Sequence, residues 1–187
     1  MTSPTGHNVE QAQEMIGARL LLREVRTSDA TGAYLKWMND EEVLKFTESR
    51  FLSCSDEQLR QYIDTINKDS SYIFRAITLR ESGRHIGNIK LGPMDWNHRF
   101  GDVGVIIGAR ECWGKGYAAE SIRLLVEYAF ASLRLHKLTA GCYATNRAAI
   151  KAFEKTGFAI EGVRTSQYLF AGHYVDLVLL GLINPAA

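Results

Sequence analysis

The chain has 187 residues, of which 46% are hydrophobic and 23% charged, a composition typical of a single soluble globular domain. Its 22 basic and 21 acidic residues nearly cancel, so the net charge of +1 gives no reason to expect binding to nucleic acid or to a membrane surface. Three cysteines without paired spacing argue against a disulfide framework, and no apolar run approaches the roughly 18 residues of a membrane span. We therefore expect a cytoplasmic protein with reduced thiols and no bound metal.

The N-terminal third predicts a tail, one strand and several helices. Residues 1–16 are mostly polar and predict a flexible tail, which leaves residues 17–187 as one domain. Ser55 followed by Gln58 has the spacing of a capping box and marks a helix start. The expected elements are a strand over 18–25, a helix over 29–38 capped by Ser28, a short helix over 41–46, a loop over 47–52 and a helix over 56–66.

The remaining two thirds predict a sheet with two further helices. Three strands separated by short polar turns form an antiparallel meander, and a helix then leads to a strand that can lie parallel to the last of them. The expected elements are strands over 72–79, 85–91 and 102–107, a helix over 117–130, a strand over 137–143, a helix over 146–156, and strands over 158–164 and 174–183. This order predicts an α/β (α+β) fold with a mixed, mostly antiparallel sheet of about seven strands and helices on both faces.

The central strand runs through Gly114-Lys115-Gly116 directly into a helix. The free N–H groups of a helix's first turn, and the positive end of its dipole, suit a phosphate group where glycines permit close approach. A tight turn that needs glycine only for its backbone angles is the simpler interpretation. A P-loop fails because no Ser or Thr follows Lys115. A dinucleotide fingerprint fits Gly114, Gly116 and Ala119, but the next strand ends without the carboxylate that this fold requires.

Several segments together resemble the GNAT superfamily of N-acetyltransferases. Residues 111–116 are similar to its acetyl-CoA loop, Gln/Arg-x-x-Gly-x-Gly/Ala, except that Glu111 stands where Gln or Arg is usual. Residues 146–158 resemble its second cofactor motif, N-x-x-[A/S]-x-x-x-[Y/F]-E-K-x-G-F. Glu161-Gly162 and residues 172–176 resemble the Rim-type branch, whose founding members acetylate ribosomal protein N-termini. The resemblance covers about residues 18–183 and implies the GNAT fold.

The resemblance also implies which residues bind acetyl-CoA. The loop that cradles the pyrophosphate corresponds to Gly114, Lys115, Gly116, Tyr117, Ala118 and Ala119. In the family two strands splay apart around the pantetheine arm, and the backbone contacts and the amide that polarises the thioester fall to Val105, Ile106 and Ile107. Asn146 contacts the arm, caps its helix, or does both. Lys151 and Lys155 reach the adenosine phosphates or are ordinary solvated charges.

The catalytic residues depart from the family pattern. Many members place a tyrosine proton donor where this chain has Phe153, and some Rim-type members use a serine where it has Ala149. Tyr143 is the alternative donor, with an aromatic residue at a strand end as the plainer interpretation. Asp102 and Glu48 are candidate bases, and each is otherwise an ordinary strand-end or loop charge. The acceptor groove implied by the family is lined by Glu48, Arg50, Trp96, His98, Tyr168 and His173.

These observations predict an acetyl-CoA-dependent N-acetyltransferase in which a primary amine attacks the thioester directly. The acceptor is a protein N-terminus or a small amine such as an amino sugar or a polyamine, and the near-neutral charge separates these poorly. We expect a monomer or a homodimer without a nucleic-acid or membrane partner. Because Phe153 and Ala149 replace the usual donors, the alternative is an acyl-CoA sensor that has lost catalysis.

Overall fold

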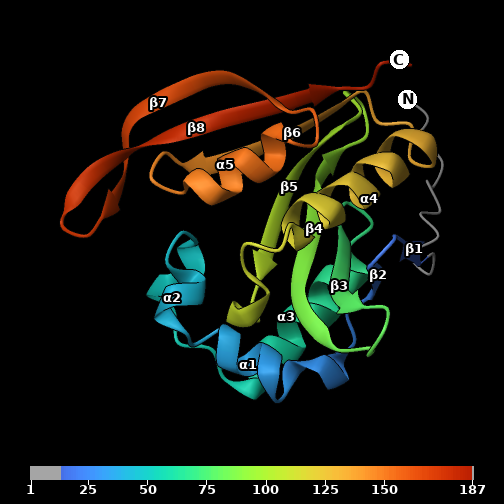
Figure 1. Ribbon diagram of the computed structural model, residues 1–187, viewed down its shortest axis with the longest axis vertical. Helices are drawn as coiled ribbons and strands as arrows, with labels where there is room; N and C mark the ends of the chain where they lie inside the picture. Colours follow the sequence, from blue (N-terminus) through green and yellow to red (C-terminus); the bar gives the residue numbers. More distant parts are fainter. Residues whose placement is uncertain (1–13, 187) are drawn as a thin grey trace, which may run out of the picture.

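The computed structural model describes residues 14–186, and its centre is a single sheet of eight strands (Figure 1). The order across the sheet is β1-β2-β3-β4-β5-β6-β8-β7, and among the described strands β5 and β6 alone pair in parallel. The strands are β1 Met15–Ile16, β2 Leu20–Glu24, β3 Ile73–Leu79, β4 His85–Asp95, β5 Phe100–Ile107, β6 Lys137–Tyr143, β7 Ala159–Phe170 and β8 His173–Ile183. The expected mixed, mostly antiparallel sheet is confirmed, with one strand more than the seven predicted.

Helices cover both faces of the sheet, with α4 and α5 on the face turned toward the viewer in Figure 1 and α3 behind it. The α-helices are α1 Ala33–Trp37, α2 Glu41–Leu44, α3 Asp56–Lys68, α4 Tyr117–Ala131 and α5 Arg147–Glu154. Three short 3-10 helices are η1 Thr27–Ala30, η2 Glu48–Phe51 and η3 Arg110–Cys112. No helix in residues 14–186 combines the length and the apolarity that a membrane crossing requires.

The core lies between the sheet and these helices. On one face α4 buries Ile122, Leu125 and Ala129 completely, at helical spacing. On the other face α3 turns Leu59 and Ile63 inward, and both are at most 1% exposed. The predicted capping box that starts α3 is confirmed, because Ser55 and Gln58 each accept a hydrogen bond from the other's backbone N–H. The two helices thus hold the sheet from opposite sides.

Three local predictions are corrected by the structure. The tail predicted over residues 1–16 lies mostly outside the described residues, but Met15 and Ile16 pair with β2 as an edge strand. The single helix predicted over 29–38 is interrupted at Gly32, whose φ of 62° is left-handed, and Asp29 instead accepts the backbone N–H of Arg26 at the start of η1. The loop predicted over 165–173 is largely strand, so β7 and β8 form one long hairpin.

The sheet separates into two halves between β5 and β6. These strands pair only at Phe100↔Lys137, Gly101↔Leu138 and Asp102↔Thr139. Beyond Asp102, β5 continues along β4 while β6 continues along β8. Because an antiparallel strand turns alternate N–H and C=O groups to its two sides, half of the backbone polar groups over 103–107 face the gap. A molecule lying in the gap therefore meets free hydrogen-bonding groups of the backbone.

Candidate active site

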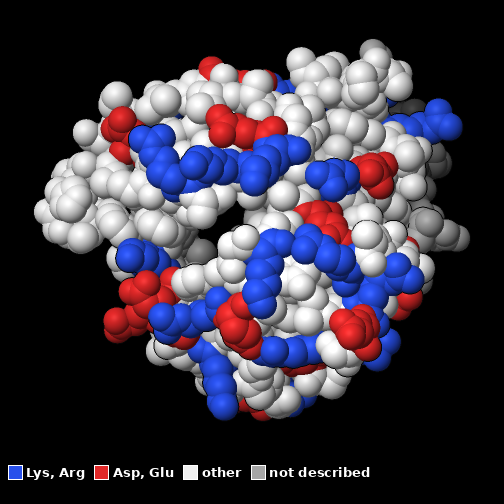
Figure 2. Space-filling model, in the orientation of Figure 1, with Lys and Arg blue, Asp and Glu red and all other residues white. Residues whose placement is uncertain are grey.

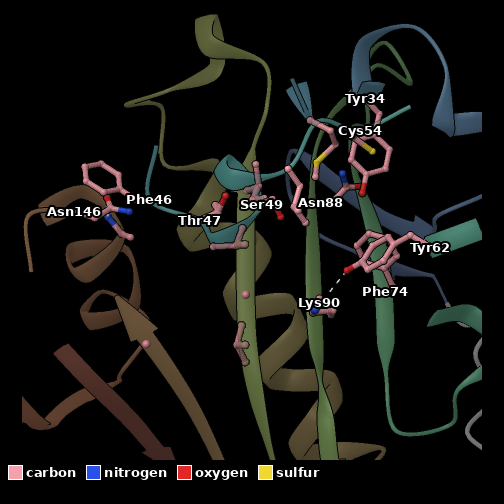
Figure 3. Close-up of a pocket in the computed structure, with 18 of the residues that line it drawn as sticks. Tyr34, Phe46, Thr47, Ser49, Cys54, Tyr62, Phe74, Asn88, Lys90 and Asn146 are labelled. Carbon is pink, nitrogen blue, oxygen red and sulfur yellow. Dashed lines mark hydrogen bonds between the residues drawn. The ribbon is translucent and has the colours of Figure 1, made fainter. Parts of the chain in front are cut away.

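A cavity of about 550 Å³ occupies the gap between β5 and β6 and continues beneath α3 (Figure 3). Val103, Gly104, Val105 and Ile106 of β5 form one wall. The facing wall comes from β6 and α5 and consists of Gly141, Cys142, Tyr143, Asn146, Ala149 and Phe153. Residues from α1, η2, α3 and β4 close the end of the cavity on the α3 side. The cavity therefore connects the two faces of the sheet.

The turn before α4 has the geometry of an anion cradle. Gly114 and Gly116 adopt left-handed φ angles of 73° and 80°, which side chains other than glycine rarely take. A Cβ atom on Gly114 would meet nothing within 4 Å, so the space above this turn is open. Gly116 is the N-cap of α4 and offers no side chain to the free N–H groups of the first turn. A phosphate oxygen can therefore approach these N–H groups directly.

Arg19 of the N-terminal part holds this turn from the side. Its Nη1 donates to the carbonyl oxygen of Lys115 at 2.9 Å, and its Nε donates to Glu120 at 2.7 Å. The guanidinium carbon lies 4.5 Å from the centroid of the Tyr117 ring. Glu120 also accepts the backbone N–H groups of Arg19 and Leu20. β2 and the first turn of α4 are thus tied together around the glycine turn.

The negative charge of Glu111 is neutralised within the protein. Arg84, in the turn between β3 and β4, pairs with the Glu111 carboxylate. The hydrogen bond from Arg84 lowers the pKa of Glu111 below its ordinary value. The departure from the family motif at this position therefore comes with a cationic partner, which offsets its repulsion of a pyrophosphate.

Basic side chains gather along α5, on one side of a hollow in the surface (Figure 2). Arg147, Lys151 and Lys155 follow each other at four-residue spacing and are all exposed. Asn146 caps this helix through a 3.2 Å hydrogen bond from the Ala149 N–H to its side-chain oxygen, and it also lies on the cavity wall. Its predicted role as a helix cap is confirmed, and contact with a pantetheine arm stays a prediction.

Tyr143, at the end of β6, belongs to a network that closes the cavity. The hydroxyl of this buried residue donates to the Glu48 carboxylate and accepts a 2.8 Å hydrogen bond from Arg50. Arg50 also donates to the carbonyl oxygen of Leu169 at 2.9 Å, and the Tyr143 ring stacks on Tyr168 with centroids 4.6 Å apart. Burial first, and then the bond to Glu48, raises the pKa of Tyr143 to about 12. The hydroxyl therefore keeps its proton and directs it toward Glu48.

Asp102 stands where β5 and β6 part, and it lines a second cavity of about 510 Å³. Thr139 on β6 donates a 2.8 Å hydrogen bond to its carboxylate. Desolvation by the surrounding protein raises the pKa of Asp102, while the Thr139 bond and the charge of Lys90 act in the opposite direction. The side chain still keeps solvent-exposed surface within the cavity. An accessible carboxylate with a raised pKa is a better base than a free one.

The second cavity lies beside the first and shares Phe46, Gly141 and Tyr143 with it. Its other lining residues are Glu48, Asp102, Thr139, Ala140, Glu161, Arg164, Tyr168, Leu177, Leu179 and Leu180. The structure thus brings together four of the residues predicted for catalysis or for the acceptor groove, namely Glu48, Asp102, Tyr143 and Tyr168, with Arg50 bonded to them.

A family model described as an acetyltransferase (GNAT) domain matches residues 19–159. The chain belongs to the GNAT acetyltransferase family. This confirms the family predicted from the motifs, and the eight-stranded sheet with its parted strands is the GNAT fold. The chain is therefore an acyltransferase of the N-acetyltransferase class.

GNAT relatives of stated activity include polyamine enzymes. N-acetyltransferase p20 of Bacillus licheniformis, which is uncharacterised, is 27% identical over 168 residues, 89% of this chain and 93% of the relative. Spermidine N(1)-acetyltransferase of Vibrio cholerae is 33% identical over 92 residues, 49% of this chain and 53% of the relative. The crystal structure of a Vibrio cholerae spermidine N-acetyltransferase with CoA and spermine has a TM-score of 0.81 at 23% identity, covering 90% of this chain and 97% of that one.

A further Vibrio cholerae structure, assigned as a ribosomal-protein-serine acetyltransferase, has a TM-score of 0.71 at 18% identity over 91% of this chain and 97% of that one. This likeness shows the shared fold.

GNAT domains use acetyl-CoA as the acetyl donor, and the residues present fit that molecule. The open glycine turn suits its pyrophosphate, the exposed cations of α5 suit further phosphate, and the free backbone groups of β5 suit the amide groups of pantetheine. Val105 and Ile106 lie on the cavity wall, and their backbone contact with pantetheine stays a prediction. The carbonyl oxygen of Ile107 accepts a 2.6 Å hydrogen bond from the Trp113 indole.

Three of the residues predicted for the acceptor groove lie away from both cavities. Trp96 and His98 lie in the turn between β4 and β5, beside the start of β6 and at the opposite end of β5 from the gap. His173 lies at the tip of the β7–β8 hairpin, where its Nδ1 contacts the Ala171 carbonyl at 3.0 Å. None of the three lines either cavity. Their contact with an acceptor stays a prediction. A sequence does not show at which end of a strand a turn lies relative to the site.

Sequence reasoning also missed residues that the structure places at the site. Arg19 lies 96 positions from Lys115 of the turn that it holds, and Arg84 lies 27 positions from Glu111, so no local pattern indicates either contact. Arg147 could have been found, because it shares the helical face of Lys151 and Lys155. Lys90 could not, since the period of a strand shows only which residues share a face and not which face meets the cavity.

Proposed function

We propose that this GNAT domain transfers the acetyl group of acetyl-CoA to a small primary amine by direct attack in the gap between β5 and β6. The observation that carries this proposal is the parting of the two strands after Asp102, which opens a cavity through the sheet. The glycine turn with its left-handed φ angles follows β5 in the chain and supports it. The spermidine acetyltransferases among the relatives favour a small amine over a protein N-terminus. Holding the two reactants in one cavity supplies much of the rate enhancement.

Different residues serve cofactor binding, deprotonation of the amine and protonation of the departing sulfur. Gly114 to Ala119, with the cations of α5, bind the phosphates, and the backbone of β5 orients the thioester. The attacking amine must lose a proton, and Asp102 is placed to take it directly or through water. Tyr143 and Glu48 position the cavity wall, because the Tyr143 proton is directed to Glu48 and its raised pKa makes it a weak acid. The departing sulfur then receives its proton from solvent in the cavity.

Two measurements on the wild-type chain test this function. Millimolar acetyl-CoA is expected to raise the midpoint of thermal unfolding, since ligand at about 100 times its Kd stabilises a fold by roughly 2.7 kcal/mol. Amine-dependent release of a free thiol from acetyl-CoA is then expected for at least one member of a panel of small amines. An unchanged midpoint would exclude the cofactor site, and binding without turnover of any amine would favour the sensor alternative.

A further inference from the structure

The end of the first cavity beneath α3 carries a positive charge and no carboxylate among its described lining residues, which is unexpected for a site that accepts amines. Its walls are aromatic and aliphatic, with Tyr34, Met38, Leu59, Tyr62 and Phe74 among them. Neutral polar side chains fill most of the remainder, and no described residue that lines this cavity carries a carboxylate. Lys90 carries the single charge among the lining residues. Figure 3 shows it beside Tyr62 and Phe74.

Lys90 is available to a ligand. Its ammonium group donates a long hydrogen bond of 3.5 Å to the Tyr62 hydroxyl and lies 5.5 Å from the centroid of the Tyr72 ring. Within the described residues no carboxylate pairs with it, and the side chain is only partly exposed. The Asp102 carboxylate interacts with Lys90 through charge but does not form an ion pair with it. A cation held by aromatic rings and free of a direct ion pair attracts an anionic group.

Lys90 and Asp102 face the same side of the sheet. Lys90 pairs with Gly104, and Asp102 precedes Gly104 by two positions on the same face of β5. The two α-carbons are therefore separated by about 7 Å along the strand and about 5 Å across it. A Cβ atom on Gly104 would meet nothing within 4 Å, so the floor between the two side chains is open. A molecule of a few carbon atoms can reach both groups.

A polyamine fits this arrangement poorly. After one amine has lost its proton, its other amines stay charged because alkyl ammonium groups have pKa values near 10.4. Lys90 repels these charges in the first cavity. In the second cavity Glu161 is already paired with Lys137 at 2.7 Å, and Glu48 lies beside Arg50 because both bind the Tyr143 hydroxyl. Asp102 is then the carboxylate left for the reacting amine itself.

We infer that the acceptor is an amino acid with an apolar side chain, whose amine lies at Asp102, whose carboxylate lies at Lys90 and whose side chain packs against the aromatic wall beneath α3. This inference rests on the proposed function and names the class of its substrate. The polyamine specificity of the spermidine relatives does not carry over to this chain. Lys90 is a specificity-determining residue for the carboxylate.

The test compares amines that differ in one feature each. Values of kcat/KM are measured by thiol release for L-phenylalanine, 2-phenylethylamine, spermidine and a phenylalanyl peptide amide. L-Phenylalanine is expected to exceed 2-phenylethylamine by about 10- to 100-fold, the range for a hydrogen bond to a charged group. Spermidine and the peptide amide are expected to be poorer acceptors than L-phenylalanine.

Variants then assign the preference to Lys90. In Lys90→Met the ratio of the kcat/KM for L-phenylalanine to that for 2-phenylethylamine is expected to fall to about one, and Lys90→Arg is expected to keep most of the ratio. The ratio is the readout because loss of the Lys90 charge also acts on the pKa of Asp102 and so on the turnover of both amines. Lys68→Met on the exposed side of α3 serves as the matched control and leaves the ratio unchanged. An acetyl-CoA Kd equal to the parent's shows that each variant is folded.

The outcomes distinguish failure of the inferred amino-acid specificity from failure of the proposed acetyltransferase function. Better turnover of spermidine or of the peptide amide overturns the inference and leaves the proposed acetyltransferase intact. A ratio that survives in Lys90→Met, or no acetylation of L-phenylalanine, also overturns it. Failure to bind acetyl-CoA, or binding without turnover of any amine, removes the proposed function as well.

Discussion

The cofactor end and the acceptor end of the candidate site are built in different ways. Around the glycine turn, a ligand meets backbone N–H groups across open space, and α5 adds exposed cations. Around Asp102 and Lys90, the contacts are side chains from many elements, which range along the chain from α1 to β8. Backbone cradles tolerate changes of neighbouring side chains, as the Glu111 position shows. The acceptor end depends on individual side chains, so it is where one fold can change its substrate.

The difference predicts that variants at the two ends fail in different measurements. A change at the glycine turn should raise the Kd for acetyl-CoA, whereas a change at the acceptor end should alter turnover of the amine and leave this Kd unchanged. A variant that changes the acetyl-CoA Kd and the amine turnover by equal factors would contradict this division of the site.

The largest effect is expected for Asp102→Asn, which should lower kcat by about 10²- to 10³-fold, within the range for loss of a general base. The acetyl-CoA Kd measured by calorimetry should stay at the parent's value. Since burial raises the pKa of Asp102, its ionised form costs folding free energy at pH 7, and the uncharged asparagine should not destabilise the fold.

Thr139→Val tests the role of the Asp102 carboxylate through its pKa. It removes a hydrogen bond that lowers the pKa of Asp102, so the acidic limb of the profile of kcat/KM against pH should move to higher pH. Turnover within twofold of the parent for Asp102→Asn would remove this residue from the mechanism.

Gly116→Val should raise the Kd for acetyl-CoA by about 100-fold, because a branched side chain would fill the approach to the free N–H groups of α4. The substitution also strains a residue with a φ of 80°. Gly172→Val is the matched control: its φ is 82°, its Cβ would meet nothing within 4 Å, and it lies at the remote hairpin tip. Equal losses of cofactor affinity in both variants would mean that strain and not the site is responsible.

Arg19→Ala should raise the Kd for acetyl-CoA by about tenfold, since the turn loses the bond to the Lys115 carbonyl and the packing on Tyr117. The amine KM should not change. Arg19→Lys keeps the charge but loses the two-sided hydrogen bonding, so an affinity restored by lysine would indicate that Arg19 acts on the phosphates by charge alone.

The smallest effect is expected for Tyr143→Phe. The ring contacts with Tyr168 are kept, and the lost hydroxyl proton is directed to Glu48 and not into the gap, so kcat should fall by less than about threefold. A loss near 10²-fold, the low end for general acid catalysis, would show that Tyr143 protonates the departing thiolate.

What the sequence predicted well was local. The capping box of α3, the glycine turn and the Asn146 cap each involve residues within a few positions, where spacing alone determines geometry. The order of helices and strands along the chain followed from periodicity, and the family followed from the resemblance of several motifs in their order. The predicted groove residues Trp96, His98 and His173 lie away from both cavities, because loop residues are positioned by the pairing of distant strands.

The contacts of Arg19, Arg84 and Lys90 were not predictable for the same reason. Each depends on a partner brought near by the fold, and neither hydrophobic period nor spacing encodes that partner.

The central claim is that acetyl-CoA lies in the gap between β5 and β6, and amide hydrogen exchange tests it most directly. Exchange is compared in the wild-type chain with and without saturating acetyl-CoA. The account predicts slower exchange over residues 103–107 and 114–119, where backbone N–H groups face the gap and the glycine turn, and unchanged exchange at the tip of the β7–β8 hairpin. Unchanged exchange over 103–107 when the ligand is bound would contradict the claim.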